Sequence, residues 1–215
     1  LIVGNGSFSY RVDVGWGQLP NGYEFGEVAG VASDSHGKIH LFNRSEHPVQ
    51  VFGSDGSFER SWGEGLFVNP HGITITSDDT YWLSDRDAHV VQKFSKEGKL
   101  LMTLGIRGVA SDTGYSDAER IVKKAGAPFN LPTKVALGSS GEIFVSDGYG
   151  NCRVHKFSAE GDHLLSWGCP GDKPGQFNLP HSVWVDRFAR VLVCDRENHR
   201  VQIFSSDGEY LSMWT

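Results

Sequence analysis

The sequence predicts an all-β protein, specifically a β-propeller built from four-stranded blades. Three observations favour this fold: one unit recurs four times along the chain, each unit contains four short hydrophobic runs, and turn residues separate the runs. A repeat of roughly 40 residues with four strands per unit is typical of a propeller blade. The 27 Gly and 13 Phe residues also fit a turn-rich β protein better than a helical one.

The first element expected is a strand over residues 8–14, ahead of the repeats and with no partner strand beside it. We interpret it as the outer strand of a blade whose other strands lie beyond residue 215. Four blades are at the lower limit of the roughly four to eight that close a propeller. We therefore expect the chain to be part of a larger ring.

The four copies follow in order. Copy one spans residues 26–63, copy two spans 69–105, copy three begins at residue 131, and copy four covers 179–214. Near the end of each copy an Asp-Gly or Glu-Gly pair predicts a hairpin turn, because Gly readily adopts the positive φ of tight turns. A Phe recurs at one position and is expected to pack between blades. This phenylalanine column consists of Phe52, Phe94, Phe157 and Phe204.

An insertion over residues 106–129 separates copies two and three. Within it, residues 116–124 predict a short helix, with Ser116 or Asp117 as the N-cap, acidic residues early and lysines late. A long loop on a repeat scaffold serves either ligand binding or only the structure, and the sequence leaves both open.

Composition excludes some classes of partner. The formal charge of −6 argues against nucleic-acid binding through a basic surface. No apolar run approaches the roughly 18 residues of a membrane-spanning helix, so no membrane partner is expected. Cys152, Cys169 and Cys194 are too few and too irregularly spaced for a disulfide framework or a metal site, although one pair could form. The compartment is not indicated.

Two histidines stand out because of their place in the repeat. His71 and His181 occupy the position after the Pro of the innermost strand, where the other copies have Ala29 and Thr133. Equivalent positions of successive blades converge on one axis, so the imidazoles would face each other across the channel. They could serve as zinc ligands or could simply cap their strands by hydrogen bonding. The remaining histidines are expected to face solvent: His36, His40, His47, His89, His155, His163 and His199.

A second column lies eight residues before the repeated Phe. It contains Arg44, Arg86 and Arg196, whereas copy three has one extra residue and places Tyr149 there. Arginine presents a donor fork suited to carboxylates, and a tyrosine beside arginine and a metal can act as a base. The alternative is that each arginine pairs with a neighbouring aspartate. We favour that alternative for Arg86. The neighbouring aspartates are Asp85, Asp147 and Asp195.

Several motifs together resemble one family. They are Gly26-Glu27-Val28-Ala29-Gly30-Val31, Phe42-Asn43-Arg44, Pro70-His71-Gly72, Ser146-Asp147-Gly148-Tyr149, Gly175-Gln176-Phe177-Asn178-Leu179-Pro180-His181 and Asp195-Arg196-Glu197-Asn198. With these motifs the chain resembles the peptidyl-α-hydroxyglycine α-amidating lyases and their bacterial relatives, which are six-bladed propellers of NHL repeats. The resemblance covers nearly the whole chain and implies one domain over residues 1–215.

The resemblance implies a role for each residue of the two columns. His71 and His181 would be two of three zinc ligands, the third falling in a later blade. Tyr149 would be the general base, and Arg44 and Arg196 would hold the substrate carboxylate. The reaction would cleave the C–N bond of a peptidyl-α-hydroxyglycine, or of a related α-hydroxy amide or ureidoglycolate, into an amide and glyoxylate.

The resemblance also implies a structural calcium, bound by the backbone carbonyls of Val31 and Ile73. The sequence departs from the family's pattern at two points. Gly150 replaces a Cys after the tyrosine, and Cys152 comes two residues later, which argues against the corresponding disulfide. Lys134 stands where the family tends to have an acid.

A second function class remains open, a non-catalytic NHL propeller that binds a protein or another ligand on its face. Under the lyase interpretation the partner is a peptide or small molecule with an α-hydroxyglycine-like end. With only two of three zinc ligands present, the 215-residue chain alone is expected to be inactive.

Overall fold

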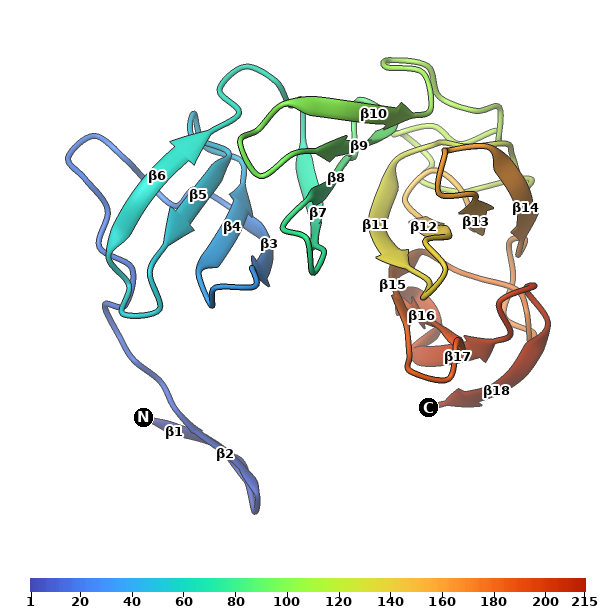
Figure 1. Ribbon diagram of the computed structural model, residues 1–215. Coiled ribbons are helices and arrows are strands. Elements are labelled where there is room, and N and C mark those ends of the chain that lie inside the picture. Colours follow the sequence, from blue (N-terminus) through green and yellow to red (C-terminus); the bar gives the residue numbers. More distant parts are fainter.

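The computed structural model describes residues 1–215 and contains four four-stranded antiparallel sheets arranged along an arc (Figure 1). Blade 1 consists of β3 (Val28–Ser33), β4 (Ile39–Asn43), β5 (Val49–Phe52) and β6 (Phe58–Trp62), and blade 2 of β7 (Pro70–Ile75), β8 (Tyr81–Asp85), β9 (Val90–Phe94) and β10 (Leu100–Leu104). Blade 3 consists of β11 (Pro132–Leu137), β12 (Ile143–Asp147), β13 (Arg153–Phe157) and β14 (His163–Trp167), and blade 4 of β15 (Pro180–Val185), β16 (Val191–Asp195), β17 (Arg200–Phe204) and β18 (Tyr210–Trp214).

The predicted fold class is confirmed. Each blade coincides with one sequence repeat, and its strands are hydrogen-bonded in chain order. The only helical element is the single 3₁₀ turn η1 (Arg196–Asn198) after β16. No helix of the structure is long and apolar enough to cross a membrane.

The N-terminal strand is not alone, contrary to the prediction. β1 (Ile2–Asn5) pairs with β2 (Phe8–Arg11) in a two-stranded hairpin that projects away from the blades (Figure 1). The two-residue turn is Gly6-Ser7, and Gly6 has a φ of 53°. A glycine at the first position of a two-residue turn is a signal for a tight hairpin, so residues 2–5 fold back to pair with residues 8–11.

The predicted helix over residues 116–124 is also wrong. Ser116 does begin a turn, because its carbonyl accepts from the Arg120 amide at 2.8 Å, but no second turn follows. Instead, the amides of Lys123 and Lys124 both donate to the Thr113 carbonyl, at 3.0 and 3.1 Å. These backbone hydrogen bonds turn the segment back toward its own beginning and exclude a continuous helix.

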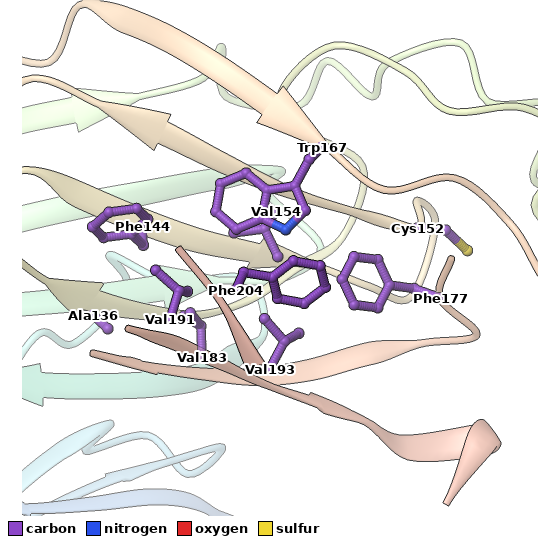
Figure 2. Close-up of a cluster of buried hydrophobic side chains, with 10 residues drawn as sticks. All are labelled: Ala136, Phe144, Cys152, Val154, Trp167, Phe177, Val183, Val191, Val193 and Phe204. Carbon is purple, nitrogen blue, oxygen red and sulfur yellow. The ribbon is translucent and has the colours of Figure 1, made fainter. Parts of the chain in front are cut away.

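The core lies between neighbouring blades, as predicted for Phe94, Phe157 and Phe204, whereas Phe52 packs against Trp16 and Phe25 ahead of blade 1. Phe52, Phe94, Phe157 and Phe204 are at most 5% exposed. In the largest cluster, Phe204 lies beside Trp167 and Phe177, with valines of β15 and β16 around it (Figure 2). Gly56, Gly98, Gly161 and Gly208 all have positive φ, as expected for the hairpin turns.

Three fully buried aspartates attach blades 2, 3 and 4 to the loops that precede them. Asp85 accepts from the amides of Val68 and Asn69, Asp147 from that of Asn130, and Asp195 from that of Asn178. The expected pairs between these aspartates and the following column residues do not form. Asp85 pairs with Arg107 and Asp195 with Arg200, at 3.2 and 2.7 Å.

Two of the histidines expected at the surface are buried. His40 lies between the Asp34 carboxylate and the Tyr81 hydroxyl, and His155 between the Asp147 carboxylate and the Ser166 hydroxyl. Each imidazole has both nitrogens engaged, so burial leaves no unpaired polar atom. For both side chains, burial holds the pKa below its ordinary value. All three cysteines are free thiols.

We expect Phe204→Ala to lower the free energy of unfolding by about 3–5 kcal/mol, because it removes a fully buried ring between two blades. Denaturant titration followed by tryptophan fluorescence measures the change. Phe188→Ala is the matched control, since Phe188 is 64% exposed, and should change stability by less than about 0.5 kcal/mol. Equal losses in both variants would contradict the assigned core.

Candidate functional site

The first column falls on a β-bulge in every blade. In the pairing of each innermost strand with its neighbour, the register shifts between Val28 and Gly30, Pro70 and Ile73, Pro132 and Lys134, and Pro180 and Ser182. Ala29, Thr133 and His181 are therefore unpaired, and in blade 2 both His71 and Gly72 are. A bulge re-aims the side chain that it carries, and this local kink accounts for the shared direction of the column.

Two histidines of the column lie against each other. The ring centroids of His71, on β7, and His181, on β15, are 4.8 Å apart, and the rings are nearly perpendicular. β11 lies between their strands and contacts both. Gly72 allows β7 to lie this close to β11, because a Cβ at residue 72 would lie 2.3 Å from the Thr133 carbonyl oxygen. The predicted convergence of the two blades on one point is thus present.

A backbone carbonyl fixes the tautomer of His71. Its Nδ1–H donates to the Thr133 carbonyl oxygen at 2.8 Å, which leaves the Nε2 lone pair free. The pKa of His71 is lowered to about 4, chiefly by burial and further by the charges of His181, Arg86 and Arg44, while the hydrogen bond to the Thr133 carbonyl raises it. Burial and the Arg196 charge also lower the pKa of His181. Both imidazoles are therefore neutral at pH 7.

Tyr149, in blade 3, is the third member of this group. Its hydroxyl lies 3.0 Å from His181 Nε2 and 3.4 Å from His71 Nε2. The tyrosine follows β12 in the loop lengthened by one residue. A Cβ on the preceding Gly148 would lie 2.1 Å from the Pro180 carbonyl oxygen, so this loop packs directly on β15. We define His71, Tyr149 and His181 as the histidine–tyrosine centre.

Two arginines flank the Tyr149 ring. The guanidinium carbons of Arg86 and Arg196 lie 4.8 and 5.5 Å from the ring centroid, and Arg196 Nη1 lies 3.4 Å from the hydroxyl. Each arginine is held by the acid that follows it: Arg86 by Asp87 at 2.6 Å and Arg196 by Glu197 at 2.8 Å. The favoured ion pair of Arg86 exists, but its partner is not the expected aspartate, and its position over the tyrosine was missed.

Arg44 does not join this group. Its Nε donates to the Pro70 carbonyl at 3.2 Å, and its guanidinium pairs with Glu27. It lines a separate hollow of about 200 Å³ between blades 1 and 2. Arg44 therefore contacts the residue before His71 and holds the start of β7.

Val31 and Ile73 line a cavity of about 160 Å³ in the channel, together with both histidines and Lys134. No carboxylate lines this cavity. Calcium prefers several oxygen ligands that include carboxylates, and the nearby ammonium of Lys134 repels a second cation. These residues do not fit calcium well.

A larger cavity of about 930 Å³ opens beside Tyr149. The insertion supplies part of its wall, including Tyr115, Asp117 and Arg120, and the blades supply Arg86 and Arg196. Burial raises the pKa of Tyr115, which keeps this phenol neutral. The insertion therefore lines the candidate site.

A second group of potential metal ligands lies away from the histidine–tyrosine centre. Ligand atoms of Asp34, His36 and Asp79 lie within 4.8 Å of one another. The Ser35 amide and hydroxyl both donate to Asp79, at 2.8 and 2.9 Å. These hydrogen bonds join a turn of blade 1 to a turn of blade 2, and this contact accounts for the cluster.

Comparison with known proteins shows which sequences this chain resembles. A family model described as "NHL repeat" matches residues 129–157 and 177–204. Human NHL repeat-containing protein 3 is 33% identical over 218 residues, covering 95% of this chain and 59% of the relative. The probable peptidyl-alpha-hydroxyglycine alpha-amidating lyase of Caenorhabditis elegans is 32% identical over 210 residues, covering 85% and 57%. The chain thus spans somewhat over half the length of these relatives.

A solved structure supports the same architecture. The streptogramin B lyase structure superposes with a TM-score of 0.65 over 90% of this chain and 56% of its own, at 13% sequence identity. At this identity the likeness concerns the fold alone, and it agrees with the propeller predicted from the repeats.

Proposed function

We propose that this chain, a member of the NHL-repeat family with homology to amidating-lyase domains, forms the site of a zinc-dependent lyase. The reaction is cleavage of the C–N bond in a peptidyl-α-hydroxyglycine or a similar α-hydroxy amide, which yields an amide and glyoxylate. One observation carries the proposal: the Nε2 atoms of two neutral histidines converge on the Tyr149 hydroxyl, with Arg196 within 3.4 Å of the same oxygen.

The two histidines fit zinc in ligand type and protonation state. Neutral imidazole nitrogen is a common zinc ligand, and a ligating histidine usually donates its other N–H to a carbonyl or carboxylate. His71 has this arrangement through Thr133. His71 and His181 would therefore hold the metal, with further ligands from outside this pair. When bound, zinc would act as a Lewis acid that makes the substrate hydroxyl easier to deprotonate.

Tyr149 would move the proton. Acting as tyrosinate, it would accept the proton of the substrate hydroxyl. The electron pair of that O–H bond then forms the C=O bond of glyoxylate, and the C–N bond breaks. The electrons of that bond go to the amide nitrogen, which receives the proton back from Tyr149. No other reactant is required, since the hydroxyl proton ends on the amide.

The two arginines would recognise the carboxylate that becomes part of glyoxylate. Arg196 and Arg86 both lie against Tyr149, so a carboxylate bound to them is adjacent to the proton acceptor. Asp87 and Glu197 hold the two guanidinium groups in place, which lowers the entropy lost on binding.

The similarity to NHL repeat-containing protein 3 supports a second candidate, a propeller that binds a partner without catalysis. The two functions differ in their need for metal. In the scaffold case no zinc would be retained, and changes at His71 or His181 would affect only stability.

The decisive assay is glyoxylate release from an N-acyl-α-hydroxyglycine by the zinc-loaded full-length protein. We expect release that stops on chelation and returns when zinc is added back. A full-length protein that retains zinc at about one equivalent but releases no glyoxylate from any α-hydroxyglycine contradicts the lyase proposal.

A further inference from the structure

Two hollows meet at Tyr149, and they differ in character. The cavity of about 930 Å³ is lined by three arginines and three acids, with Arg86 and Arg196 nearest Tyr149, whereas the neighbouring hollow of about 510 Å³ combines Ile121, Val122, Phe177 and Leu179 with fewer charged residues, Arg120 and Asp172. Tyr149, Arg120, Asn178 and Leu179 line both. A ligand bound at the Tyr149 hydroxyl can therefore extend into a charged space on one side and a more apolar space, which we call the apolar hollow, on the other.

The apolar hollow is built from two parts of the chain. Its floor comes from the blades, where Phe177 and Cys152 are buried at 0% and 4% exposure. Its rim comes from the insertion, where Ile121 is 59% exposed. The amides of Lys123 and Lys124 donate to the Thr113 carbonyl, and these hydrogen bonds set the path of this rim.

The substrate of the proposed reaction has matching polarity. Its carboxylate and its acyl group lie on opposite sides of the bond that breaks. With the carboxylate on Arg86 and Arg196, the acyl group is the part left to occupy the apolar hollow. The exposed Ile121 side chain gains from contact with an apolar acyl group, because the isoleucine surface and the acyl surface both leave water.

We propose that the preferred substrates carry a bulky apolar acyl group or side chain next to the α-hydroxyglycine, and that Ile121 is a specificity-determining residue for it. This inference rests on the proposed lyase function for the orientation of the substrate. It assigns the insertion over residues 106–129 a direct role in substrate selection.

The test is equilibrium binding, which does not depend on turnover. N-phenylacetylglycine and N-acetylglycine share the carboxylate and amide, lack the reactive hydroxyl, and differ in the apolar group. Calorimetric titration of the zinc-loaded chain should show at least about tenfold tighter binding of the phenylacetyl compound. Ile121→Asn should reduce that ratio to below about threefold.

Ile106→Asn is the matched control, because Ile106 is 69% exposed in the same insertion and lines neither hollow. It should leave the ratio unchanged. A wild-type ratio below threefold, or an equal loss in both variants, overturns the inference.

The same series separates this inference from the proposed function. Glyoxylate release from phenylacetyl- and acetyl-α-hydroxyglycine with equal kcat/KM would overturn the apolar subsite while supporting the lyase. The binding preference with its Ile121 dependence, but without glyoxylate from either compound, would support the subsite and contradict the lyase.

Discussion

Tyr149→Phe should lower glyoxylate release by about 10²- to 10⁴-fold, because it removes the proposed proton acceptor and leaves the ring in place. Zinc retention and the unfolding midpoint should stay as in the wild type. The expected loss is in kcat, since the two arginines that would bind the carboxylate are unchanged. Steady-state kinetics on one α-hydroxyglycine substrate gives the comparison.

Tyr115→Phe provides the control for this change. Tyr115 lines the same cavity but comes from the insertion and contacts neither imidazole. Its hydroxyl can be removed with little effect on kcat. If the Tyr149 variant keeps kcat within about threefold of the wild type, the assigned base is wrong.

His71→Ala and His181→Ala should each weaken zinc binding by at least about a hundredfold, because each removes one of the proposed nitrogen ligands. Competition with a chromophoric chelator measures the affinity, and elemental analysis measures the metal retained. Using two positions in different blades guards against a loss caused by misfolding of one of them.

His163→Ala is the corresponding control, since His163 is exposed on β14 and contacts only the Ser166 hydroxyl by hydrogen bonding. It should leave zinc affinity unchanged. Wild-type affinity in both the His71 and the His181 variants would place any bound zinc elsewhere and remove the basis of the proposed centre.

The blades were predictable because each depends on local signals. Alternating hydrophobic runs, turn glycines and a recurring Phe all occur within one repeat, and the repeat supplied the same signals four times. Convergence of His71 and His181 followed from the same logic, since equivalent positions of successive blades lie around one axis. The bulge that aims these side chains was not predicted, because it depends on strand register.

Other features depended on contacts that a repeat pattern does not contain. His40 and His155 are buried because Asp34 and Asp147 lie within reach across the blade. The insertion does not form a helix because its amides bond back to the Thr113 carbonyl, and helix propensity alone could not reveal that competitor. By contrast, the Gly6-Ser7 turn was a readable signal for the N-terminal hairpin and was missed.

The contacts of the arginine column at the candidate site were also not predictable from the repeat pattern. Sequence position identified Arg86 and Arg196 but not their partners, because the direction of a long side chain is set by its neighbours. Asp87 and Glu197 hold these arginines, whereas the buried aspartates before them bind backbone amides. Arg44 occupies the equivalent sequence position, yet it pairs with Glu27 and lies outside the histidine–tyrosine centre.

The most direct test of the lyase proposal is product identification by mass spectrometry. Zinc-loaded protein is incubated with N-phenylacetyl-α-hydroxyglycine, and the products are compared with those of the uncatalysed reaction and of Tyr149→Phe. We expect phenylacetamide and glyoxylate in equal amounts, formed faster than in either comparison. Phenylacetic acid as the product, or no rate above the uncatalysed reaction, would contradict it.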